Sequence, residues 1–224
     1  MVKQVTGVKG LRKEFLTILG EKLTAVSFEG KPKGQSIRKP FNYGWVAVHI
    51  TFINHLDDID LVINLAIRFD KVEELIHRNN LLLSATEKKN TATLGVELGN
   101  WVVGHQKRWN ITPKSNLHSV ANSMFNYFLE FGSLYLEKYS NIDEAYELLS
   151  RDDSNAWLHS PNHTLRALKA VAIAKLFDKP DLKKLINSKK AFLEERKERD
   201  LKKYIKFVED IDENIKAMTS SKIG

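Results

Sequence analysis

The clearest pattern in the chain is an alternation of apolar and polar positions between residues 43 and 69. The apolar positions are Val46, Val48, Ile50 and Phe52 in a first run and Leu61, Ile63, Leu65, Ile67 and Phe69 in a second. Successive side chains of a strand point to opposite faces of a sheet, so a period of two indicates a half-buried strand. The two runs therefore predict two adjacent strands joined by the acidic turn at residues 55–59.

Further strands are expected on both sides of this hairpin. Residues 36–41 fit a short edge strand, and residues 92–98 alternate as the hairpin does. Glycines in 99–104 predict a bend or bulge, and residues 109–111 would form a last strand. Residues 30–34 fit a loop by their glycines and proline. Hairpin-like connections favour a mainly antiparallel sheet of four or five strands.

Elsewhere the apolar residues recur at helical spacing. Helices are predicted over residues 9–25 and 71–78 and from Ser115 through Tyr135. A short helix is expected to end at Leu149, another to run from Ser160 to Phe177, and a last one to begin at Pro180. The class is therefore α+β, with an N-terminal helix, a sheet and a C-terminal helical region. We expect a sheet region at 1–112, helices packed on it at 113–178, and a charged helical extension at 179–224.

The extension contains seven consecutive charged residues at 194–200. A helix that is polar all round cannot lie flat on a core, so we expect a protruding or bent helix there. The apolar positions that follow are spaced by three and four, as in two short heptads: Leu201, Tyr204, Val208, Ile211 and Ile215. They would pack on the same chain or on a second copy, so a monomer and a homodimer through this helix both stay open.

Composition narrows the class of protein. The chain has no cysteine, which excludes disulfides, cysteine nucleophiles, thiolate zinc sites and iron–sulfur clusters. It has no apolar run long enough to cross a membrane, and its first residues lack the apolar stretch of a signal peptide. We therefore expect a cytoplasmic, bacterial protein that does not associate with membranes.

The net charge of +7 is concentrated near the N-terminus, where residues 1–40 hold nine Lys or Arg against three Glu. Such a segment indicates contact with nucleic acid, contact with an acidic partner, or simply a solvated surface. The residues that would contact nucleic acid are Lys9, Arg12, Lys13, Lys31, Lys33, Arg38 and Lys39.

The chain lacks the glycine-rich loops that bind nucleotide phosphates, and it lacks the motif around the nucleophilic serine of many hydrolases. We expect no cofactor. His55 stands near Asp57, Asp58 and Asp60, which are ligand types for a divalent ion. Acidic residues at a hairpin turn normally serve solubility and turn geometry, so no metal site is predicted.

The best candidates for a binding site surround the hairpin. His49, His55, Asp57 and Arg68 are expected to converge near one of its ends, and Trp45 shares the polar face of the first strand with His49. Aromatic and basic residues that alternate on a sheet can stack nucleic-acid bases. No catalytic residue is assigned.

Several short runs resemble a known family. They are F-x-G-K-P-K-G-Q-S-I-R-K-P at 28–40, Gly44-Trp45, L-A-I-R-F-D at 65–70 and K-R-W-N-I at 107–111. With the order of elements, they resemble an uncharacterised bacterial domain-of-unknown-function family whose members are similar to small immunity proteins. The resemblance covers residues 9–150. It implies a helix, an antiparallel sheet and further helices, and no catalytic residues.

Three hypotheses about function follow. The favoured one is a non-enzymatic binding or interaction protein of the immunity or antitoxin type, with a protein partner. The first alternative is a nucleic-acid-associated protein that uses the basic N-terminal region. The second is an enzyme with dispersed catalytic residues.

Overall fold

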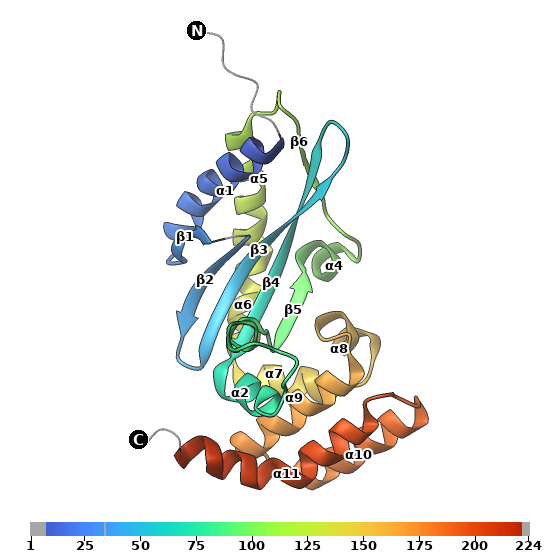
Figure 1. Cartoon of the computed structure of the whole chain (residues 1–224). Helices are drawn as coiled ribbons and strands as arrows, with labels where there is room; N and C mark the ends of the chain where they lie inside the picture. The colour runs from blue at the N-terminus through green and yellow to red at the C-terminus, as the bar shows by residue number, and fades with distance from the viewer. Residues whose placement is uncertain (1–7, 34, 221–224) are drawn as a thin grey trace. The chain divides into compact units, whose positions relative to one another are not determined.

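The computed structural model describes residues 8–33 and 35–220. It confirms the α+β class, with an N-terminal helix, an antiparallel sheet and a C-terminal helical region (Figure 1). The chain divides into two compact units. Unit 1 comprises residues 1–67 and 95–138, and unit 2 comprises residues 68–94 and 139–224. These limits differ from the three consecutive segments expected from the sequence, because the chain enters unit 2 twice.

The sheet has six strands within the described residues, in the order β1-β2-β3-β4-β5, and β6 also pairs with β4. The strands are β1 (Glu29–Lys33), β2 (Ser36–Phe41), β3 (Gly44–Asn54), β4 (Ile59–Phe69), β5 (Leu94–Glu97) and β6 (Trp109–Ile111). The β1–β2, β2–β3 and β4–β6 pairings are antiparallel. The predicted alternation is confirmed in β3, where Val48 and Ile50 are buried and His49 is half-buried.

Helices cover the apolar face of this sheet in unit 1. They are α1 (Val8–Thr24), α4 (Leu98–Val103), α5 (Leu117–Tyr127), the π-helical turn η1 (Phe128–Gly132) and the first part of α6 (Ser133–Ser140). The predicted stripe of α1 is buried, and α1 packs against α5. Figure 1 shows α5 passing behind the strands. Phe28 and Phe128 meet edge to face, with ring centroids 5.6 Å apart.

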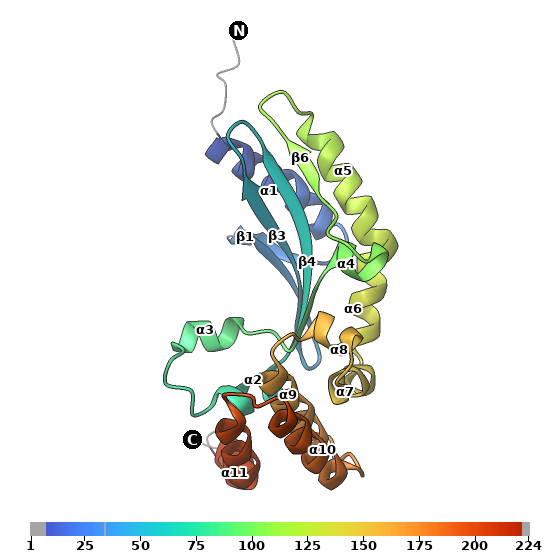
Figure 2. The same cartoon turned by 90° about the vertical axis from the view of Figure 1, so that its right-hand side faces the viewer.

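Unit 2 is mainly helical. Its helices are α2 (Asp70–His77), α3 (Ala85–Asn90), α7 (Ile142–Ser150), α8 (Ser154–His159), α9 (His163–Leu176), α10 (Leu182–Glu195) and α11 (Leu201–Ser220). α9 is the central helix, because residues 167–174 are buried on every side. It packs against α2, α7, α10 and α11, and Figure 2 shows α9, α10 and α11 side by side.

The chain bends within the seven-residue charged run, which is one of the two outcomes expected from the sequence. α10 ends at Glu195, and Lys197 takes a left-handed backbone conformation with φ of 53°. The amide N–H of Glu198 then donates to the carbonyl of Leu193 at 3.0 Å, which closes the turn. α11 then packs against α9 and α10 of the same chain, and its residues Tyr204, Phe207 and Ile211 are buried.

Three local predictions about the sheet were wrong. Residues 30–33 belong to β1 rather than to a loop, so β2 is not an edge strand. Pro40 is still tolerated because β1 pairs with β2 only between Ser36 and Arg38, and Pro40 lies beyond that stretch. Residues 98–103 form α4 rather than a bulged strand, because the Glu97 carboxylate caps the helix.

Two helix starts also differ from prediction, by one to three residues. Asn116, not Ser115, caps α5, and Asn162 caps α9 by accepting from the amide of Leu165 at 2.8 Å. Pro161 therefore precedes the cap of α9 instead of occupying its first turn. Asparagine and serine are both good caps, so the sequence alone did not distinguish them.

Candidate binding groove

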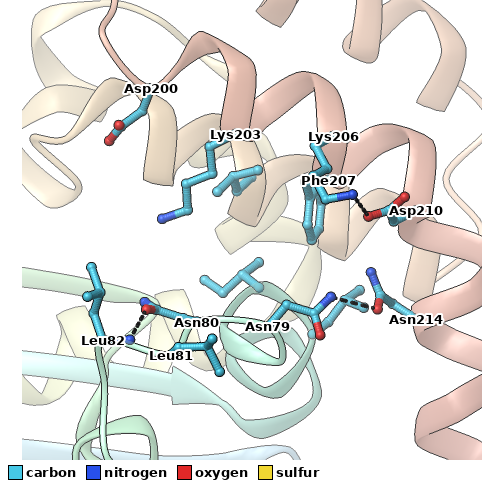
Figure 3. A pocket seen from close by; sticks show the side chains of 13 residues that line it. Asn79, Asn80, Leu81, Leu82, Asp200, Lys203, Lys206, Phe207, Asp210 and Asn214 are labelled. Atoms are coloured by element: carbon cyan, nitrogen blue, oxygen red, sulfur yellow. Dashed lines mark hydrogen bonds and ion pairs between the residues drawn. The ribbon is translucent and has the colours of Figure 1, made fainter.

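A groove of about 520 Å³ lies in unit 2, between α11 and the loop that follows α2 (Figure 3). We call it the groove throughout. Its lining residues are Leu75, Ile76, Asn79, Asn80, Leu81, Leu82, Leu168, Asp200, Lys203, Lys206, Phe207, Asp210 and Asn214. All of them belong to unit 2. The volume is within the range of about 300–1,000 Å³ that is usual for ligand sites in proteins.

The floor of the groove is apolar and part of the folded core. Leu75 and Ile76 come from α2, Leu168 comes from α9, and Phe207 comes from α11. Each is at least nine-tenths buried. The floor is therefore held by packing between three helices, and its shape does not depend on a bound molecule.

Hydrogen bonds fix the loop that forms one wall. The amide N–H of Leu82 donates to the side-chain oxygen of Asn80 at 3.0 Å. The Asn79 side-chain amide donates to Asn214 on α11 at 3.3 Å and so links the two walls at one end. Ser84 and Glu87 form a capping box that starts α3 immediately after the loop.

Two leucines stand exposed on this wall. Leu81 is 95% exposed and Leu82 is 92% exposed, although both line the groove. A single exposed apolar side chain is ordinary, but adjacent ones at the mouth of an apolar groove indicate an interaction surface. The sequence analysis missed them. The sequence feature that could have revealed them is the run of three leucines at 81–83 between polar segments.

The charged residues of the opposite wall differ in whether they have a partner of opposite charge. Lys206 pairs with Asp210 at 3.0 Å on α11. Figure 3 shows the Lys203 side chain extending toward the loop wall, whereas Asp200 lies at the end of the groove away from Asn214. In the described part of the chain, the Lys203 ammonium has no ion pair or hydrogen bond. Within the same described residues the Asp200 carboxylate has no ion pair either, so the groove offers one unpaired charge of each sign.

Elsewhere in unit 2, two sets of charged side chains are buried beside side chains of opposite charge. We call the first set the Glu73 cluster. Glu73 is 1% exposed, with Lys169 Nζ 4.0 Å from its Oε1 and His77 Nε2 3.4 Å from its Oε2. Burial alone would raise the pKa of Glu73, but the Lys169 charge and the neighbouring His77 and Thr91 lower that pKa to about 2. For Lys169 the burial penalty is larger than the attraction to Glu73, and its pKa is lowered.

The second set, the Asp152 network, joins three segments of unit 2. Lys189 Nζ lies 2.7 Å from Asp152 Oδ1, and Arg166 Nη2 lies 3.4 Å from the same oxygen. Both cationic side chains are fully buried. Arg166 also donates to the carbonyl of Ser160 at 2.7 Å. One carboxylate thus ties the segment before α8 to α9 and α10.

Of the predicted candidates, Trp45, His49, His55 and Asp57 lie in unit 1, whereas Arg68 lies in unit 2. The Arg38 guanidinium stacks 3.9 Å above the Trp45 ring. His49 Nδ1 lies 2.7 Å from the Ser36 hydroxyl, and burial lowers the pKa of His49. Ser36 and His49 are partners in the β2–β3 register, so the structure brings His49 onto a strand pair that also carries Arg38.

The acidic turn gathers a different set of residues from the one predicted. His55, Asp58 and Asp60 offer ligand atoms that all lie within 4.8 Å of one another, and Asp57 is not among them. Asp60 is already engaged, because Arg108 and Asn110 donate to its two oxygens at 3.2 and 3.0 Å. The hydrogen bonds from Asn110, His55 and Arg108 lower the pKa of Asp60 against the raising effect of its burial.

Arg68 is near the other end of β4 from this turn. It donates to the carboxylate of Asp70 at 2.6 Å and to Thr91 at 2.7 Å, and its side chain is 4% exposed. The structure therefore does not bring Arg68 together with His55 and Asp57. Its role is to hold the end of α3 against the start of α2.

The basic residues expected to contact nucleic acid are only partly described. Arg12 donates to Asn54 and lies 5.2 Å above the ring of Phe52, and Lys13 is exposed on α1. Lys39 is half-buried on β2. The side chains of Lys9, Lys31 and Lys33 lie outside the part that the structure describes.

Comparisons with protein-family models, with curated proteins and with solved structures found no match. Among the described residues, no helix combines the length and apolar character needed to cross a membrane.

Proposed function

We propose that this chain is a non-enzymatic binding protein that holds an apolar segment of another protein in the groove. The observation that carries the proposal is the pair of exposed leucines, Leu81 and Leu82, at the mouth of a preformed apolar groove. Burying a leucine side chain contributes about 1.5–3 kcal/mol, so a partner that covers both gains a substantial driving force.

Two further features support this function. The floor is rigid because it belongs to the core of unit 2, so binding requires little ordering of this chain. The loop wall is anchored at Asn79 and Asn80, which keeps the leucines in place before a partner arrives. An immunity- or antitoxin-like partnership, which the family resemblance implies, is one form that this function would take.

The proposal is tested by comparing three tagged proteins in a native, nuclease-treated lysate of cells that express the chain. They are the wild type, the double variant Leu81→Ser/Leu82→Ser, and the control Leu56→Ser. Leu56 is also 92% exposed, but it lies in the β3–β4 turn of unit 1. We expect a stoichiometric protein with the wild type and the control, and its loss with the double variant. Equal recovery with all three proteins would contradict the use of the groove.

A further inference from the structure

We infer that His163 is an acid-sensitive latch, which holds the turn between α10 and α11 while its ring is neutral and releases that turn when the ring takes up a proton. The inference goes beyond the proposed function and does not depend on it. Three observations carry it: the hydrogen bond that the ring accepts, the packing of the ring on α10, and the charges that surround it. All of the residues involved belong to unit 2.

The hydrogen bond of His163 requires a neutral ring. Nη2 of Arg166 lies 2.7 Å from Nδ1 of His163. A guanidinium carries only donors, so Nδ1 must accept, and an imidazole nitrogen accepts only while it bears no proton. The proton of the neutral ring therefore belongs to Nε2. Protonation of Nδ1 would place two donors against each other at this distance.

The ring also joins α9 to the end of α10. His163 is the first residue of α9, and its ring meets that of Phe192 on α10 edge to face, with centroids 5.3 Å apart. The guanidinium of Arg196, which caps the end of α10, lies 5.1 Å from the centroid of the same Phe192 ring. Lys197 in the turn follows directly. His163, Phe192 and Arg196 thus form a continuous series of contacts from α9 to the turn.

Most of the surroundings of the His163 ring oppose its protonation. Arg166 faces the ring from α9, and Arg196 faces it from the end of α10. The carboxylates of Asp152, before α8, and Glu198, in the turn, act in the opposite direction. The first position of α9 adds the positive end of the helix dipole. Burial and the two guanidinium charges lower the pKa of His163 below its ordinary value of 6.5, against the two carboxylates.

The direction of the pH effect follows from this lowered pKa. The stability that the neutral ring contributes is present in full above pH 6.5 and is lost as the pH falls from 6.5 through the folded-state pKa of His163. At pH 5.5, one unit below the ordinary value, protonation favours the released turn by up to about tenfold. α11 begins directly after the turn and forms one wall of the groove, so the latch links pH to the position of that wall.

The test compares four full-length proteins at pH 7.5 and pH 5.5. They are the wild type, His163→Gln, whose uncharged amide oxygen can accept from Arg166, His163→Lys, which carries a positive charge at both pH values, and the control His118→Gln. His118 is an exposed histidine on α5 in unit 1. Amide hydrogen exchange, corrected for the intrinsic effect of pH, reports the opening of residues 192–204. An NMR titration of the wild-type histidines gives the pKa of His163, whose signal is identified by its absence in His163→Gln.

In the wild type we expect the exchange of residues 192–204 to rise several-fold, and at most about tenfold, from pH 7.5 to pH 5.5. The control should behave as the wild type does. His163→Gln should stay protected at both pH values, and His163→Lys should exchange rapidly at both. The titration should give a pKa of His163 below 6.5.

The opposite results would overturn the latch. A pKa of His163 at or above 6.5 would mean that the fold does not favour the neutral ring. Exchange of residues 192–204 that is independent of pH in the wild type, or that changes equally in His163→Gln, would mean that the ring does not hold the turn. Equal protection of the wild type and His163→Lys would mean that the turn tolerates the charge. The NMR titration uses the wild type alone, so it decides the inference even if His163→Lys does not fold.

Discussion

The Asp152 network and the groove use the same residue types in opposite ways. In the network, Lys189 is fully buried and lies 2.7 Å from its carboxylate partner. In the groove, Lys203 is exposed and unpaired within the described residues, and the neighbouring leucines are exposed as well. Both regions belong to unit 2 and draw on helices that carry many lysines.

The difference indicates what each region is for. A buried ion pair is costly to break because the remaining charge is left without water or partner. The buried charges of the Asp152 network and the Glu73 cluster therefore lie beside charges of opposite sign. The leucines and Lys203 of the groove are exposed instead, and we propose that they serve a partner. Substitutions in the network should thus reduce stability, and substitutions in the groove should reduce binding alone.

The largest effect is expected for Asp152→Ala. The variant leaves Lys189 and Arg166 buried without their shared carboxylate, so the free energy of unfolding should fall by about 3–5 kcal/mol. Urea denaturation measures it. The adjacent Asp153→Ala is the matched control, because Asp153 caps α8 and otherwise pairs with the exposed Arg151, so its loss should cost about 1 kcal/mol. Equal losses for the two variants would remove the distinction between network and surface.

A smaller, pH-dependent effect is expected for Glu73→Gln. The folded-state pKa of Glu73, about 2, lies below its ordinary value of 4.5, so the ionised group stabilises the fold above pH 4.5. That stability is lost as the pH falls toward 2. The variant should therefore be about 3 kcal/mol less stable than the wild type at pH 7, and the difference should shrink between pH 4.5 and pH 2.

The control for this variant is Glu74→Gln, an exposed position on the same helix, which should change the stability by no more than about 0.5 kcal/mol. Thermal or urea unfolding of the three proteins across this pH range gives the comparison. A difference between Glu73→Gln and the wild type that stays constant with pH would argue against the lowered pKa.

On the groove side, Leu81→Ser/Leu82→Ser should leave the stability within about 0.5 kcal/mol of the wild type, because both leucines are exposed. The same variant should retain less than about a tenth of the partner protein that the wild type recovers, given the apolar area that a partner covers. Urea unfolding checks the stability, and recovery of the partner from native lysate checks the binding. A large loss of stability would mean that these leucines stabilise the fold instead of serving a partner.

The sequence predicted elements that depend on local periodicity. The β3–β4 hairpin and α1 were found because each shows its own period of two or 3.6. On α11 the predicted stripe included the buried Tyr204 and Ile211 but missed Phe207. β1 was missed because Gly30 and Pro32 carry loop signals, although pairing with β2 holds them in a strand. α3 was missed because it is short and polar, and its capping box was not recognised.

The groove could not be predicted in the same way. Leu75 and Asn214 are far apart in the sequence and share the lining only because α2, α9 and α11 pack together. Lys189 and Lys203 also look alike in the sequence, since both stand in charged helical segments. Only the fold shows that one lysine has a buried partner and the other does not.

The most direct test is an NMR titration of the ¹⁵N-labelled full chain with a synthetic amphipathic peptide that carries a stripe of leucines. The account predicts chemical-shift changes at the amides that line the groove, centred on Leu81, Leu82, Lys203 and Phe207. The amides beside Trp45 and His49 in unit 1 should stay unchanged. Shift changes confined to the sheet of unit 1, or none at saturating peptide, would contradict the assignment of the groove as the binding site.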